Sequence, residues 1–258
     1  MHLPEPPGSV EEKGVFHMPV IWWSHLIWLL ALAAGSFLVS WLFTDLFRLA
    51  RTVYVAILAV VTAAFLYGYL SWINMDWAAF LSYQWVWGLI GAVIVGPLLI
   101  VSVAQGAKRS HAPILTSAPG PAGLRLVGAL VWEGIVYGSA EGLLLSVLPV
   151  LITWQVLSAF GWTQSWLGVI LTGTIALIAS LVVIVVHHLG YREFRGPLVA
   201  VAAMTCGTLS LAYLLTVNPL AAVGGHIIMH TGAILHGTEL PPHQEKRELA
   251  GASALSTR

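Results

Sequence analysis

The chain has 258 residues, of which 58% are hydrophobic and only 9% are charged, and its formal net charge at pH 7 is zero. A soluble domain carries about 25% charged residues, so this composition excludes an ordinary soluble protein and indicates an integral membrane protein. The balanced charge offers no basic face for nucleic acid. The lone cysteine, Cys206, excludes an intramolecular disulfide and a cysteine-rich metal site.

The N-terminal segment, residues 1–19, is polar and contains proline, and it lacks the positively charged start of a signal peptide. The apolar run that follows continues to about residue 43, which is long enough to cross a bilayer. We therefore expect a retained membrane helix there, as the first part of a single transmembrane helical domain that covers residues 20–238. Residues 239–258 are polar and are expected to form a disordered cytoplasmic tail.

About 20 consecutive apolar residues cross the hydrocarbon core as a helix, and this rule predicts an all-α, polytopic bundle of about seven transmembrane helices. The fourth apolar run is too long for one straight crossing, and Pro149 is expected to kink or end it. Small residues recur in that run at helical spacing and predict a seam that packs closely on another helix; they are Gly134, Gly138, Ser139 and Gly142. The predicted spans are 20–43, 52–73, 84–105, 125–155, 164–188, 198–217 and 220–238.

The positions of Lys and Arg predict the orientation of the bundle, because these residues favour cytoplasmic loops. An external N-terminus and a cytoplasmic C-terminus place every Lys and Arg except Lys13 on the cytoplasmic side. We therefore predict this orientation, in the cell membrane. The residues on the cytoplasmic side would be Arg48, Arg51, Lys108, Arg109, Arg125, Arg192, Arg195, Lys246, Arg247 and Arg258.

Two glutamates, Glu133 and Glu141, lie within the fourth span, where ionisable groups are costly and usually functional. No Lys or Arg lies deep in a span to neutralise them. A carboxylate beside imidazoles can take a proton from water, and Glu with two or three His also matches known ligand sets of Zn²⁺. The alternative is a hydrogen-bonded carboxyl group with a structural role only.

Histidines lie on two further spans. His226 and His230 are four residues apart, so they share one face of the seventh span. The adjacent His187 and His188 end the fifth span and lie about 100° apart around the helix, so only one of them is expected to face the polar centre. The alternative for His226 and His230 is hydrogen bonding between helices, which stabilises a membrane bundle by about 0.6–2 kcal/mol. The alternative for His187 and His188 is a place at the polar interface beside Arg192.

Three short motifs follow one another along the second half of the chain: EGLLLS at 141–146, IVVHH at 184–188 and HIIMH at 226–230. In this order they resemble the EExxxR, FxxxH and HxxxN or HxxxD motifs of the CAAX-protease and bacteriocin-processing (CPBP) family of intramembrane proteases. The resemblance covers about residues 124–238, and the first three spans are compatible with it. The chain departs from the family at four positions, where Glu, Arg, Phe and Asn or Asp are replaced by Gly142, Ser146, Ile184 and His230.

This resemblance implies an intramembrane endopeptidase that hydrolyses a peptide bond with a Glu-activated water. Glu141 would activate the water, and His188, His226 and His230 would bind the water, the oxyanion or a metal ion. The same four residues are the candidate ligands of Zn²⁺, and whether the site uses Zn²⁺ or no metal stays open. The implied partners are membrane lipids and a membrane-bound or lipidated peptide or protein substrate.

Two other functions compete with this one. The missing Glu–Arg pair of the first motif favours a non-catalytic membrane scaffold or a transport-related protein on the same fold. Histidines on two helices favour a His-ligated metal or haem protein. A simple observation tests each alternative. A haem protein is coloured, and a scaffold yields no cleaved product.

Overall fold

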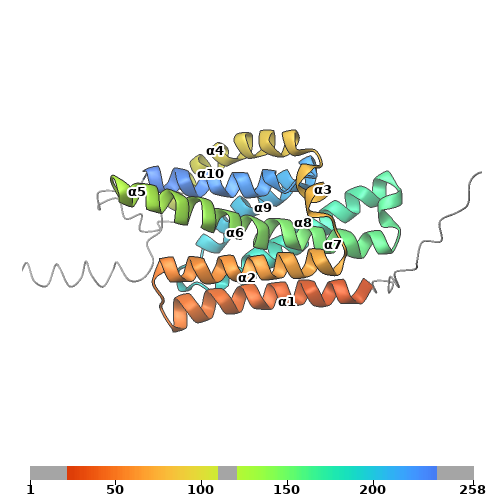
Figure 1. Cartoon of the computed structure of the whole chain (residues 1–258), viewed down its shortest axis with the longest axis horizontal. Coiled ribbons are helices and arrows are strands. Elements are labelled where there is room, and N and C mark those ends of the chain that lie inside the picture. The colour runs from red at the N-terminus through yellow and green to blue at the C-terminus, as the bar shows by residue number, and fades with distance from the viewer. Residues whose placement is uncertain (1–21, 110–120, 237–258) are drawn as a thin grey trace, which may run out of the picture.

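The computed structural model describes residues 22–109 and 121–236, and this part of the chain consists of helices joined by short loops, without a strand (Figure 1). The predicted polar N-terminal segment, 1–19, and the predicted tail, 239–258, lie outside the described residues. The helices are α1 (Trp22–Ser40), α2 (Arg51–Trp72), α3 (Trp77–Ser82), α4 (Trp85–Arg109), α5 (Leu124–Ala129), α6 (Gly138–Glu141), α7 (Leu148–Ala159), α8 (Trp166–Leu189), α9 (Leu198–Thr216) and α10 (Leu220–His236). The π-helical segments are η1 (Trp41–Leu46), η2 (Leu130–Tyr137) and η3 (Gly142–Val147), and the 3₁₀ turns are η4 (Trp162–Gln164) and η5 (Arg192–Phe194).

The predicted membrane helix bundle is confirmed in its main features. Six helices of the described chain are long and apolar enough to cross a bilayer, and they correspond to the first six predicted spans. The seventh predicted span is present as α10, a shorter apolar helix. Its crossing of the membrane and the orientation of the bundle stay predictions. The six long apolar helices are Trp22–Leu46, Arg51–Trp72, Trp85–Ser102, Leu124–Ala159, Trp166–Leu189 and Leu198–Thr216.

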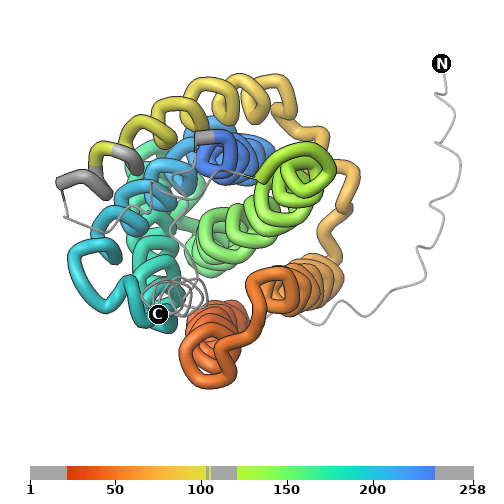
Figure 2. The backbone as a smooth tube through the Cα atoms, turned by 90° about the vertical axis from the view of Figure 1, so that its left-hand side faces the viewer, coloured from red at the N-terminus to blue at the C-terminus, as the bar shows by residue number. Residues whose placement is uncertain are grey.

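The fourth long helix, Leu124–Ala159, lies at the centre of the bundle. Of its most apolar stretch, 72% is buried, whereas no other long helix exceeds 44%. Figure 2 looks along the bundle and shows this helix in green, with α1 and α2 on one side and the blue α10 on the other. In turn α10 packs on α4 and α9 and on the η2, α6 and η3 segments of the central helix. The last helix is therefore enclosed by the others.

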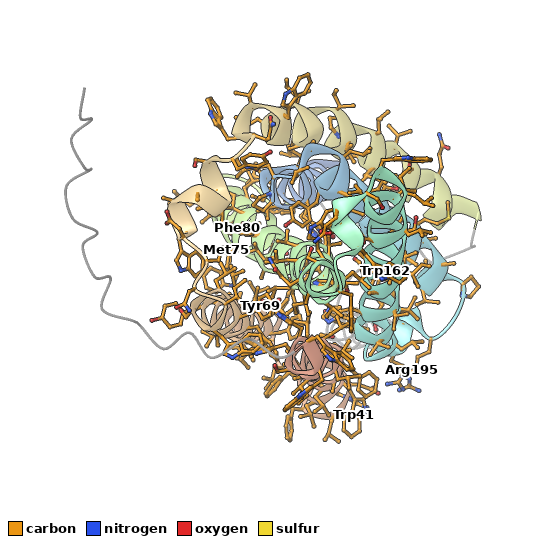
Figure 3. All side chains as sticks on the ribbon, turned by 90° about the vertical axis from the view of Figure 1, so that its right-hand side faces the viewer. Trp41, Tyr69, Met75, Phe80, Trp162 and Arg195 are labelled. Atoms are coloured by element: carbon orange, nitrogen blue, oxygen red, sulfur yellow. The ribbon has the colours of Figure 1, made fainter. Side chains whose placement is uncertain are left out.

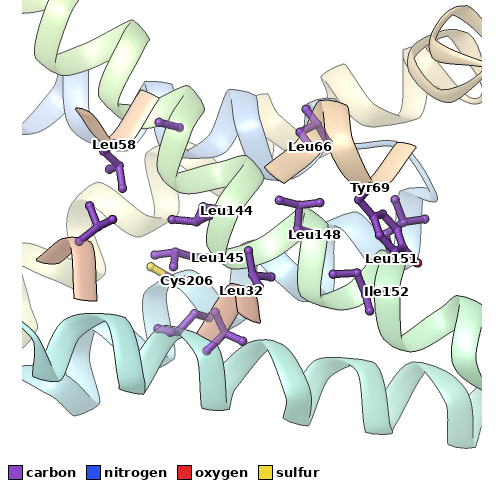
Figure 4. Close-up of a cluster of buried hydrophobic side chains, with 14 of the residues drawn as sticks. Leu32, Leu58, Leu66, Tyr69, Leu144, Leu145, Leu148, Leu151, Ile152 and Cys206 are labelled. Carbon is purple, nitrogen blue, oxygen red and sulfur yellow. The ribbon is translucent and has the colours of Figure 1, made fainter. Parts of the chain in front are cut away.

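The outer surface of the bundle is apolar. Large hydrophobic side chains such as Leu30, Val60 and Trp166 are at least two-thirds exposed, and Figure 3 shows side chains projecting outward all round the bundle. In a soluble protein such a surface would aggregate, whereas lipid tails cover it at no cost. The interior holds a cluster of leucines, shown in Figure 4, between α1, α2 and the central helix. Cys206 lies in this cluster as a small buried hydrophobic residue.

Pro149 does not end the fourth span, contrary to one of the two outcomes predicted for it. The helix continues through it to Ala159. Because proline has no backbone N–H, the carbonyl of Leu145, four residues earlier, loses its usual donor. The hydroxyl of Ser180 on α8 donates to this carbonyl at 2.7 Å and also contacts the Ser210 hydroxyl of α9. A neighbouring helix thus satisfies the group that proline leaves free.

Replacing Ser180 with Ala is expected to lower the free energy of unfolding by about 1–2 kcal/mol, because the Leu145 carbonyl would lose its donor inside the bilayer. Titration with a denaturing detergent in mixed micelles measures this change. Thr174→Ala is the matched control, since the exposed Thr174 hydroxyl bonds only to Ile170 of its own helix. Equal stability of the two variants would contradict the assignment.

Candidate active site around Glu141

Glu141 is placed by a close approach of two helices. It ends α6, which carries glycines on the face turned toward α10. A methyl group added at Gly138 would lie 3.0 Å from the Cα of Ile227, and one added at Gly142 would lie 2.9 Å from the Cα of Val223. The predicted seam of small residues is confirmed at these two glycines. This close packing brings the carboxylate of Glu141 within reach of side chains on α10.

The helix around Glu141 is also unusual in its winding, since π-helical segments lie on both sides of α6. A π-helical turn holds an extra residue and changes the direction of the side chains that follow, and such turns are frequent at functional sites. The sequence gives no local signal for them.

Both oxygens of the buried Glu141 carboxylate have hydrogen-bond partners. Tyr137, one turn earlier, donates its hydroxyl proton to Oε1 at 2.6 Å. His230 of α10 lies with its Nε2 2.9 Å from Oε2. Two more imidazoles approach without bonding: His226 Nδ1 is 3.9 Å from Oε2, and His187 Nε2 is 3.8 Å from Oε1. The predicted convergence of Glu141 with His226 and His230 is therefore found in the structure.

His226 is fully buried, and neither of its ring nitrogens has a hydrogen-bond partner among the described residues. A buried polar group without a partner costs about 1–3 kcal/mol. The ring lies nearly parallel to that of His230, with the two centroids 6.1 Å apart. A polar group bound between His226 and the Glu141 carboxylate would recover the lost hydrogen bond.

The structure corrects the choice between the two histidines that end α8. The family spacing assigns His188, but His187 is the one that lies beside Glu141. The Nδ1 of His188 instead bonds to the carbonyl of Ile184 in its own helix, at 2.8 Å. His187 is turned inward because α1 holds it, since Ser40 donates to its carbonyl at 2.7 Å and Nδ1 bonds to the Ser36 carbonyl at 3.1 Å.

Glu133 is not part of this site. It forms an ion pair with Arg51, the first residue of α2, with 3.2 Å between Nε and Oε2. The expectation of two unneutralised glutamates therefore fails for Glu133, because a cation from the end of a neighbouring helix reaches it. The Arg51 guanidinium also lies over the Tyr137 ring, 5.6 Å from its centroid.

The departures from the family motif have structural reasons. A side chain at Gly142 would collide with the backbone of α10, so a second glutamate cannot stand there in this packing. Ser146, at the position of the arginine, is buried, and its hydroxyl reaches the carbonyl of Cys206 on α9. Ile184 is fully buried in the apolar cluster. At His230, a histidine replaces the amide or carboxylate and still contacts Glu141.

The donor atoms also fit a metal ion. The ligand atoms of Glu141, His226 and His230 all lie within 4.8 Å of one another. Around Zn²⁺, with bonds of about 2.0–2.2 Å, tetrahedral ligand atoms are about 3.3 Å apart, and the distances from Oε2 to the two imidazoles, 2.9 and 3.9 Å, bracket that value. His188, the fourth candidate ligand, is not in this group.

Sequence reasoning did not assign His187 or Tyr137 to the site, although His187 was one of the two histidines of which one was expected to face the polar centre. Tyr137 stands four residues before Glu141, and this spacing was the available signal, because side chains four apart meet on one face of a helix.

Comparison of the chain with protein-family models, with curated proteins and with solved structures returned no match. The fold and the geometry at Glu141 thus carry the functional argument, and they describe a membrane helix bundle with a buried carboxylate–imidazole site.

Proposed function

We propose that this protein is an intramembrane endopeptidase, similar to the CPBP family, in which Glu141 activates a water molecule. The observation that supports it is the convergence of Glu141 with His226 and His230 in the interior of a membrane bundle. A carboxylate and two imidazoles are costly at this depth. A purely structural role would leave both nitrogens of His226 bonded, whereas they are free to bind water or an oxyanion.

The reaction follows from the positions of these groups. Water binds between the Glu141 carboxylate and His226, and Glu141 takes its proton as the hydroxide attacks the carbonyl carbon of the peptide bond. His226 and His230 donate hydrogen bonds to the oxyanion that forms. The C–N bond then breaks, and Glu141 returns the proton to the leaving amine. The balance is one water consumed and two peptide ends formed.

The substrate reaches this site from one end of the bundle. Glu141 and His226 are closed off, but the side chain of His230 is 15% exposed and the nearby Arg51 and Glu133 are each 21% exposed. In the predicted orientation this end faces the cytoplasm, and the membrane is the cell membrane. The matching substrate is a membrane-bound or lipidated peptide, whose anchor stays in lipid while the scissile bond enters at His230.

The test reconstitutes the full chain in liposomes with lipidated peptides of varied sequence and follows products by mass spectrometry. Cleavage by the wild-type protein that Glu141→Gln abolishes is the expected result. An absence of cleavage across the peptides, together with retention of specific partner proteins in a pull-down, would favour the scaffold or transport-related alternative.

A second candidate is a zinc-dependent form of the same hydrolase, favoured by the ligand spacing of Glu141, His226 and His230. These three residues would hold Zn²⁺, which supplies Lewis acidity and a more acidic bound water when present. Elemental analysis of the purified protein separates the candidates: about one Zn²⁺ per chain, lost in His226→Ala, supports zinc, and an active metal-free protein excludes it. Haem is less suited, because both imidazoles approach the same carboxylate oxygen.

A further inference from the structure

A row of aromatic residues in polar contact extends from Glu141 to α2 and to the end of α8. The hydroxyl of Tyr137 bonds to Glu141 and lies 3.4 Å from the hydroxyl of Tyr191, in the loop after α8. Tyr191 in turn bonds to the hydroxyl of Tyr54 on α2 and, at 3.2 Å, to Nε2 of His187. The row joins α2, the central helix and α8, and of its members only His187 lies within a motif that resembles the CPBP family.

Which group donates in each hydrogen bond of this row follows from the contact between His187 and a backbone carbonyl. The backbone carbonyl of Ser36 can only accept, so Nδ1 of His187 carries the proton that points at it. The Nε2 of a neutral His187 is then an acceptor, and the hydroxyl proton of Tyr191 is donated to it. Tyr54 donates to the oxygen of Tyr191. The protons of Tyr137 and Tyr191 are then both used elsewhere, so their hydroxyl oxygens, 3.4 Å apart, are in contact without a proton between them. Burial raises the pKa of Tyr191 well above its usual value, so its hydroxyl keeps its proton at neutral pH.

The side chain of Tyr137 is held in place by contacts with three neighbouring residues. Its ring meets the ring of His230 edge to face with centroids 4.8 Å apart, lies beside the ring of Tyr54 and is covered by the guanidinium of Arg51. Its single proton is donated to Oε1 of Glu141, whereas His230 and His226 lie against Oε2, so the two carboxylate oxygens have different partners. Oε2 is thereby left facing the place where water would bind.

We propose that Tyr137, braced by Tyr191 and Tyr54, is the positioning residue that orients the Glu141 carboxylate, in place of the Glu–Arg pair that the chain lacks. This inference rests on the proposed peptidase function for its effect on rate, while the contact itself can be tested without it. A small displacement of a catalytic group costs about 100-fold in rate. Removing one hydroxyl therefore lowers kcat and leaves KM almost unchanged, because Tyr137 does not bind the substrate.

The experiment compares Tyr137→Phe with Tyr69→Phe in the full chain. Tyr69 is a matched control, because it is buried, its hydroxyl bonds to His25 at 2.8 Å, and it lies about 22 Å from Tyr54 along α2. We expect kcat to fall about 10–100-fold in Tyr137→Phe, with KM within about twofold of wild type, and neither constant to change in Tyr69→Phe. Tyr191→Phe is expected to give a smaller fall of the same kind.

A second readout does not depend on activity. The infrared bands of the Glu141 carboxyl group, assigned by their loss in Glu141→Gln, are expected to shift in Tyr137→Phe and to stay in place in Tyr69→Phe. Unshifted bands, or an unchanged kcat in an active protein, would overturn the positioning role. Shifted bands in a protein whose wild type cleaves no peptide would instead overturn the proposed function and leave the Tyr137–Glu141 contact intact.

Discussion

Replacing Glu141 with Gln is expected to lower the rate of peptide cleavage by about 10²–10⁴-fold, the usual contribution of a general base. Glutamine has the shape of glutamate and can still accept the hydroxyl proton of Tyr137, but it cannot take a proton from water. The bundle should therefore fold as before, with circular dichroism and detergent unfolding unchanged within error. Initial rates on a lipidated peptide in liposomes measure the effect.

Glu133→Gln is the matched control for this variant. The same substitution falls on the same helix, but it removes only the ion pair with Arg51, which is partly exposed and worth about 1 kcal/mol or less. Its cleavage rate should remain close to that of the wild type. A Glu141→Gln protein that cleaves as fast as Glu133→Gln would remove Glu141 from the reaction.

Adding one methyl group at Gly142 is the second change with a large expected effect. In Gly142→Ala the new carbon would lie 2.9 Å from the Cα of Val223 and 3.3 Å from the imidazole of His226. Carbon atoms prefer about 3.5–4.0 Å, and a backbone atom cannot move aside as a flexible side chain can. Helix α10 must therefore shift, which costs about 1–3 kcal/mol of stability.

The same shift moves His226 and His230 away from Glu141, so the cleavage rate of Gly142→Ala is expected to fall about 100-fold. Gly142→Glu, which introduces the residue that the CPBP motif has at the equivalent position, should be worse than Ala rather than better. The control is Gly128→Ala, because a methyl group there meets no atom within 4 Å. Normal stability and activity in Gly142→Ala would show that α10 does not pack as described.

The fold was largely predictable, because the length and apolarity of each run decide where a membrane helix can lie. The positions of Glu141, His226 and His230 were predictable as well, since few other ionisable groups lie inside the apolar runs. Their meeting across 85 residues of sequence depends on Gly138 and Gly142, whose spacing indicated close packing but did not identify the partner helix. Only the structure shows that the partner is α10.

The remaining differences come from contacts that no local pattern records. The choice of His187 over His188 is made by Ser36 and Ser40 on α1, about 150 residues earlier in the chain. The partner of Glu133 is a residue at the end of another helix. The helix continues past Pro149 because Ser180 satisfies a carbonyl from outside. In each case hydrogen bonds or an ion pair between distant segments decide the outcome, and helical periodicity contains no information about them.

The position of α10, last among the described helices and enclosed by the others, has a consequence for biosynthesis. A ribosome delivers Glu141 and His187 to the membrane before His226 and His230 have been translated. Until α10 enters its place against the central helix, Glu141 has neither imidazole of that helix beside it, and no water can be held between them. In the proposed mechanism, the nascent protein therefore cannot hydrolyse a substrate until α10 has taken its place, and the insertion of this helix completes the site.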